Sequence, residues 1–128
     1  MNLQLLDFDC TEDAEGVVCW DALAQPARVH NTALLAEVTQ VLNWCHRFDP
    51  QGPGPLEDGA DWDYDLQLSL HGDAHHAQPA WPAVVRFDPA TGSLHLPPGA
   101  DQQAMALSLS ISGSPGFGEA FREQFRLP

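Results

Sequence analysis

The chain has 128 residues, the usual size of one domain, and folding at this length buries roughly two-thirds of the surface that the unfolded chain exposes. Its formal net charge at pH 7 is −13, from 18 Asp and Glu against 5 Arg and no Lys. Nucleic acids and anionic membrane surfaces are bound largely through Lys and Arg, so this charge argues against both as partners. A basic protein or a metal cation remains compatible, and the alternative is that the charge only maintains solubility.

Nothing in the first residues, 1–7, resembles a signal peptide, so we expect a cytoplasmic protein. No apolar run approaches the roughly 18 residues that a membrane span requires. Cys10, Cys19 and Cys45 are odd in number and match no zinc or redox spacing, which predicts reduced thiols packed in the interior. No repeat or internal boundary is visible, so we expect residues 1–128 to form a single domain, with an oligomeric state that the sequence does not define.

The N-terminal third predicts a β-hairpin followed by a helix. Residues 3–10 alternate apolar and acidic side chains, which indicates a half-buried strand, and residues 16–20 predict a second strand after a polar turn. From residue 31 or 32 to about residue 47 the apolar residues recur at helical spacing. Asn31 is the expected N-cap, and the helix should end before Asp49 because Pro50 follows.

The rest of the chain predicts four strands and a short helix. Residues 62–71 alternate strictly and give the clearest strand. Residues 83–87 and 93–96 flank a turn whose glycine, Gly92, supplies a positive φ, so they predict a hairpin. Residues 105–111 predict the last strand, and a helix from about residue 118 to residue 125 should dock Phe117, Phe121 and Phe125 on the sheet.

Together these elements predict an α+β fold, with an antiparallel sheet of about six strands and two helices packed on one face, in the order ββαββββα. Such a sheet leaves one polar face. We expect it to serve as a binding surface formed by Asp63, Asp65, Gln67, Ser69, His71, Ser108 and Ser110. The alternative is an ordinary solvated face, as many antiparallel sheets have.

The string Leu5 to Thr11, with its Asp-x-Asp-x-Thr pattern, resembles the first motif of haloacid-dehalogenase-type phosphatases. That resemblance implies a doubly wound parallel sheet, Asp7 as nucleophile and Asp9 as acid/base beside magnesium. The chain departs from the family in having no lysine to neutralise a phosphate. The alternative is a strand with two outward-facing aspartates.

A second cluster, His71, Asp73, His75 and His76, contains ligand types that zinc, nickel or copper favour, although its spacing matches no recognised metal motif. These four residues are the candidate metal ligands, and a solvated loop is the alternative. We expect no cofactor. The sequence therefore favours a non-enzymatic interaction or accessory module that binds a basic protein, with a metal-dependent hydrolase or phosphatase using Asp7 and Asp9 as the alternative.

Overall fold

The structure, a computed structural model, describes residues 2–71 and 80–128. In chain order the elements are β1 (Asp9–Glu12), β2 (Val18–Ala24), the 3-10 turn η1 (Arg28–His30), α1 (Asn31–Phe48), η2 (Leu56–Asp58), β3 (Trp62–His71), β4 (Trp81–Ala83), β5 (Arg86–Asp88), β6 (Ser93–His95), η3 (Ala100–Gln102), β7 (Ala104–Gly113) and α2 (Pro115–Phe125). The predicted α+β class is confirmed.

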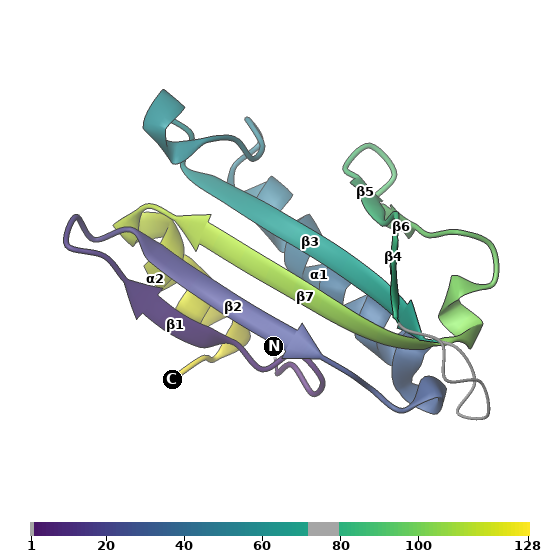
Figure 1. The fold of residues 1–128 in the computed structure, drawn as a ribbon. Helices are drawn as coiled ribbons and strands as arrows, with labels where there is room; N and C mark the ends of the chain where they lie inside the picture. Colours follow the sequence, from purple (N-terminus) through teal and green to yellow (C-terminus); the bar gives the residue numbers. More distant parts are fainter. Residues whose placement is uncertain (1, 72–79) are drawn as a thin grey trace.

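Five strands form one antiparallel sheet in the order β1-β2-β7-β3-β4, and β5 and β6 form a separate two-stranded sheet. The last strand of the chain, β7, therefore lies in the centre, between β2 and β3. Figure 1 shows α1 and α2 together on one side of the larger sheet, which leaves its other face open. The predicted strand order holds approximately, but the sequence did not reveal β4 or the division into two sheets.

The core lies between the larger sheet and the two helices. Alternate residues of β2 and β7 point into it, because successive side chains of a strand point to opposite faces. The two helices complete it with one apolar stripe each. The buried side chains of these four elements include Val18, Trp20, Ala22, Ala24, Leu34, Val38, Val41, Leu42, Cys45, Met105, Leu107, Leu109, Ile111, Phe117, Phe121 and Phe125.

Helix α2 docks by its aromatic edge, as the spacing of its phenylalanines predicts. The Ser114 side chain caps the helix by accepting a hydrogen bond from the Phe117 amide at 3.3 Å. The Phe117 ring stacks parallel to Trp62, with 5.7 Å between centroids and 4° between planes. Gly118 lets the helix approach β2 closely, since a Cβ at this position would lie 2.8 Å from Val18 Cβ.

The N-terminal segment corrects one prediction. Strand β1 covers only residues 9–12, and residues 3–8 are not a strand although Leu6 and Phe8 are buried. The amides of residues 4–6 donate to the Glu37 carboxylate on α1 at 3.0–3.2 Å, so a side chain replaces the neighbouring strand as their acceptor. Apolar alternation alone does not distinguish backbone amides that donate to a neighbouring strand from amides that donate to a side chain.

The start of α1 corrects a second prediction, that of the N-cap. Asn31 is the first helical residue rather than the cap, and its side chain is fully buried. Its Nδ2 donates to the carbonyls of Asp101 and Gln103, at 3.0 and 2.7 Å, which fastens the helix start to the segment before β7. The Asn31 side chain, which local propensity predicts as an N-cap, makes tertiary hydrogen bonds instead.

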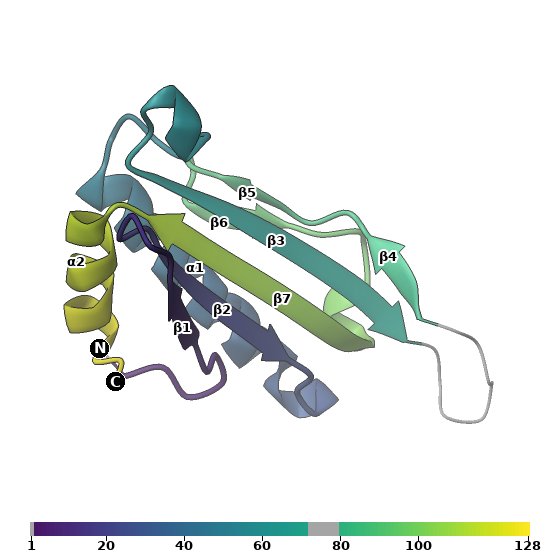
Figure 2. The ribbon, with the colours of Figure 1, turned by 60° about the vertical axis from the view of Figure 1, so that its left-hand side comes forward.

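The β5–β6 hairpin is a separate small unit beside β3, as the turned view shows (Figure 2). Gly92 adopts the positive φ expected of its turn, 68°. The hairpin is fastened to α1 by the Asn43 side chain, whose Nδ2 donates to the Gly92 carbonyl at 3.1 Å. The Phe87 ring also stacks on His46 at 5.3 Å.

The three thiols occupy different environments. Cys45 is buried in the core as predicted, and burial raises its pKa above its usual range. Cys10 is exposed and Cys19 is half-buried, so the prediction of interior packing is wrong for these two. Separately, within residues 2–71 and 80–128, no helix is long and apolar enough to cross a membrane.

Candidate functional site

The open face of the larger sheet is built by the same alternation that builds the core. In β2, Cys19, Asp21 and Leu23 point away from the helices, between residues that point toward them. Residues directly opposite in an antiparallel pair share a face, so the strand register shows which side chains lie together. The open face therefore includes Asp9, Thr11, Cys19, Asp21, Leu23, Asp63, Asp65, Gln67, Ser69, His71, Ser108, Ser110 and Ser112.

All seven residues of the predicted binding surface lie on this face. Asp63, Asp65, Gln67, Ser69 and His71 come from β3, and Ser108 and Ser110 come from the adjacent β7. Their positions follow from two correctly predicted strands, whereas their role in binding stays a prediction.

Sequence reasoning missed the half of the face that β1 and β2 contribute. Asp21 and Leu23 lie beyond residue 20, where the predicted second strand ended. The alternation of Trp20, Ala22 and Ala24 with Asp21 and Leu23 was the available signal. Asp9 was considered as a catalytic residue or as an outward-facing strand residue, but not as part of the binding surface.

A row of carboxylates crosses the open face perpendicular to the strands. Asp9 pairs with Asp21, Asp21 pairs with Ser110, and Ser110 pairs with Asp65. All three aspartates are exposed. Neighbouring strands lie about 4.8 Å apart, so Asp21 and Asp65 stand roughly 10 Å apart across the serine. The face thus presents an acidic row with small hydroxyl side chains at its centre.

Neutral neighbours hold two of these carboxylates, Asp21 and Asp65, in place. Ser110 Oγ donates a short hydrogen bond to Asp21 Oδ1, and Gln67 Nε2 donates to Asp65 Oδ2 at 2.9 Å. The Cys19 thiol donates to Asp21 Oδ2 at 3.5 Å. Burial, and then the Asp21 carboxylate, raise the pKa of Cys19 to about 11, which keeps it a thiol donor at neutral pH. An ionised carboxylate offers about four acceptor positions, so Asp65 retains capacity for a partner's donors.

Positive charge is segregated from this face. The strands that form it, β1, β2, β7, β3 and β4, contain no Lys or Arg. The five arginines lie in η1, α1, β5 and α2 and at the residue after α2, as Arg28, Arg47, Arg86, Arg122 and Arg126. Among the described residues of these five strands, the one histidine is His71, at the end of β3.

The phosphatase-like string falls in a different setting from the one its resemblance implies. Asp7 lies in the segment before β1 and Asp9 begins β1, and both side chains are exposed. Strand β1 is an edge strand of an antiparallel sheet, whereas the resemblance implies a doubly wound parallel sheet. Asp9 instead lies in the acidic row of the open face.

The histidine cluster is only partly described. His71 ends β3, and Asp73, His75 and His76 lie outside the described residues. Within the described part of the chain, no group of three or more His, Cys, Asp or Glu side chains is arranged to hold a metal ion.

No family model, curated protein or solved structure matches this chain.

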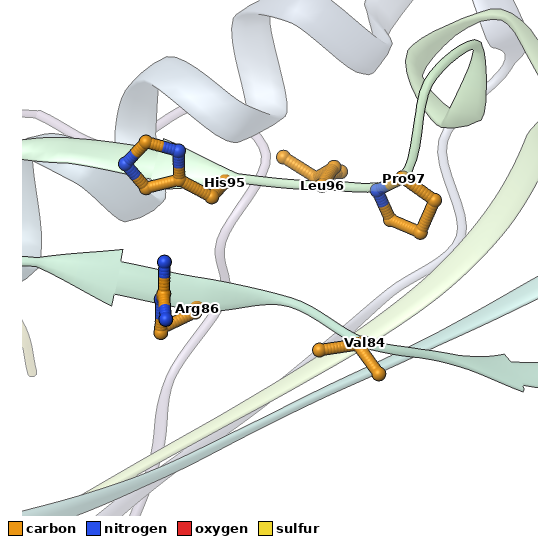
Figure 3. A pocket seen from close by; sticks show the side chains of 5 residues that line it. All are labelled: Val84, Arg86, His95, Leu96 and Pro97. Carbon is orange, nitrogen blue, oxygen red and sulfur yellow. The ribbon is translucent and has the colours of Figure 1, made fainter.

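A second feature is a pocket of about 360 Å³ on the β5–β6 hairpin, lined by Val84, Arg86, His95, Leu96 and Pro97 (Figure 3). Arg86 and His95 are directly opposite each other in the two strands. Sequence reasoning identified this hairpin but assigned no role to its side chains. The signal in the sequence was a period of two, which places Val84, Arg86 and Asp88 on one face of an extended strand.

Proposed function

We propose that this protein is a non-enzymatic interaction module that binds a basic protein through the open face of its five-stranded sheet. The observation that carries the proposal is the acidic row Asp9, Asp21 and Asp65, on a face whose strands contain no arginine or lysine. A basic partner would supply the cations that this face lacks. Such complementarity mainly accelerates encounter and determines which partners are accepted.

The shape and size of the face support a protein partner. Ser108, Ser110 and Ser112 form a lane of short side chains along β7, with longer side chains on β2 and β3 beside it. β3 and β7 are each 10 residues long. At about 3.3 Å per residue and about 4.8 Å per strand, the 4, 7, 10 and 10 residues of β1, β2, β7 and β3 present roughly 500 Å². This is about what each partner buries in a transient protein–protein interface.

The test is an affinity capture from lysate of the source cells, followed by binding measurements with the purified partner. We would compare the wild type with a triple variant, Asp9→Asn, Asp21→Asn and Asp65→Asn. The matched control is Glu57→Gln, Asp58→Asn and Glu119→Gln, which removes equal charge from exposed residues of η2 and α2. We expect the triple variant to bind a basic partner about tenfold more weakly and the control to bind almost as the wild type does.

Salt provides the second arm of the experiment. The Debye length falls from about 10 Å at 0.1 M to about 3 Å at 1 M, so high salt should release the partner. A complex that high salt leaves intact, or that the triple variant retains as well as the control does, would show that the acidic row is not the binding surface. An empty capture, together with no binding of a synthetic arginine-rich peptide, would overturn the proposal entirely.

A further inference from the structure

The outward face of the β5–β6 hairpin combines a cationic end with an apolar end. Arg86 is directly opposite His95, and continuing the same register places Val84 opposite Pro97. Figure 3 shows these two pairs side by side, with Arg86 and His95 at one end of the pocket and Val84 and Pro97 at the other. Phe87 and Leu94, on the alternate positions, belong to the core side of the hairpin.

We infer that this pocket binds a small monocarboxylic acid with a short apolar tail, with its carboxylate between Arg86 and His95 and its tail on Val84 and Pro97. The site is independent of the open sheet face and of the basic partner proposed for it. Arginine is the side chain best suited to the carboxylate, because its planar guanidinium can donate two parallel hydrogen bonds.

The charges around the pocket favour an anion of low charge. Arg86 forms no ion pair within the described part of the chain. The Arg86 guanidinium and the His95 imidazole lie directly opposite each other, so N–H groups of both side chains can donate to one carboxylate. Asp88 lies 3.9 Å from His95 on the side of the turn, where it can orient the imidazole. Because the whole chain carries −13, a monoanion meets less repulsion here than a phosphate or a polyanion would.

The apolar end is exposed and partly preformed. The Val84 side chain is 80% exposed, so it is accessible to a ligand. Pro97 has a ring-fixed φ and Val84 a stiff χ1, so both walls lose little freedom on binding. The two cross-strand pairs are two residues apart, or roughly 7 Å, which matches the distance from a carboxylate to the end of a short alkyl chain.

The size of the pocket sets the expected affinity. Its volume of about 360 Å³ lies near the lower end of the range for small-molecule sites. A ligand with so few atoms, bound at an open site, should have a dissociation constant on the order of 1 mM. Hexanoate is therefore a suitable probe, with hexanol as the uncharged control and acetate as the control without a tail.

The experiment is a titration of the ¹⁵N-labelled full chain with each probe, followed by ¹H–¹⁵N spectra. We expect saturable shifts with hexanoate at the amides of residues 84–86 and 95–96, and much weaker effects from hexanol and acetate. Arg86→Gln should weaken hexanoate binding about tenfold, as loss of a charge-assisted hydrogen bond does. Arg126→Gln, which removes the same charge after α2, should bind as the wild type does.

Each alternative outcome overturns the inference. Shifts that never saturate would show only adventitious contact with the hairpin. Equal loss in Arg86→Gln and Arg126→Gln would indicate general attraction of anions by any arginine. Equal binding of hexanol would identify the pocket as an apolar surface without carboxylate recognition. Because Arg86 is exposed, its replacement should leave the spectrum of the rest of the protein unchanged, which checks the fold in the same experiment.

Discussion

The two faces of the five-stranded sheet are made by the same strands and differ in almost every property. In β2, Trp20 is 1% exposed beside the Phe121 ring of α2, while Leu23, three residues later, is 68% exposed on the open face. The covered face is aromatic and aliphatic, and the open face carries aspartate, serine and glutamine. Stability is therefore concentrated on one set of alternate residues, and the other set is available for recognition at little cost to the fold.

Charged groups show the same contrast. Glu37, on the covered side, is 9% exposed, and its carboxylate accepts hydrogen bonds from the amides of Gln4, Leu5 and Leu6. Asp9, on the open side, is exposed and lies opposite another aspartate. A buried carboxylate must be satisfied by the protein itself, whereas an exposed one can remain available to a partner. We expect substitutions of the two groups to differ accordingly.

Strand β2 offers the sharpest test of the two faces. Trp20→Ala should lower the free energy of unfolding by about 3–5 kcal/mol, because it leaves a large cavity beside Phe121. Leu23→Ala, on the same strand, should change it by no more than about 0.5 kcal/mol. Urea unfolding followed by far-UV circular dichroism measures both. Similar losses for the two variants would mean that the open face is packed in solution, for example against a second copy.

Glu37→Gln tests the buried carboxylate. The amide side chain keeps the size, but it has one acceptor oxygen and turns an NH₂ group toward backbone donors. We expect a loss of about 1–3 kcal/mol in the free energy of unfolding. Hydrogen exchange of the amides of residues 4–6 should accelerate locally. Glu119→Gln, exposed on α2, is the control. If exchange at residues 4–6 is unchanged, the carboxylate does not hold the N-terminal segment.

We expect His46 to make the stability of the covered side depend on pH. Its Nε2 is buried and has no hydrogen-bond partner within the described residues, and its ring lies between Trp62 and Phe87. Burial lowers the pKa of His46 below its ordinary value of 6.5. The unfolded chain therefore binds more protons as the pH falls through 6.5, so the His46 contribution to stability is complete above that pH and declines below it.

His46→Phe keeps an aromatic ring against Phe87 and removes the titration. Urea unfolding at pH 7.5 and pH 5 should show a smaller loss of stability on acidification in this variant than in the wild type. All other residues are identical in the two proteins, so the difference between the two curves isolates His46. Parallel curves would indicate that protonation of His46 does not destabilise the folded protein.

The contrast between faces was predictable from the sequence only along single strands. Residues 62–71 alternate without interruption, so both the strand and its outward side chains were predicted correctly. The acidic row was not predicted, because it joins residues 9, 21, 110 and 65 through a strand order that the sequence does not state. The clamp of residues 4–6 by Glu37 was missed for the same reason, since it connects positions more than 30 residues apart.

The smallest effect on stability should come from the acidic row itself, and its sign is informative. Like charges directly opposite in a sheet destabilise it, and Asp9 and Asp21 are such a pair. Asp9→Asn should therefore raise the free energy of unfolding by a few tenths of a kcal/mol at low salt, with the gain vanishing at high salt. Glu57→Gln, in η2, should show no such gain. A loss of stability in Asp9→Asn would mean that its carboxylate is held by contacts within the chain. A gain would show that repulsion between Asp9 and Asp21 destabilises the free protein. A basic partner on the open face would remove that repulsion.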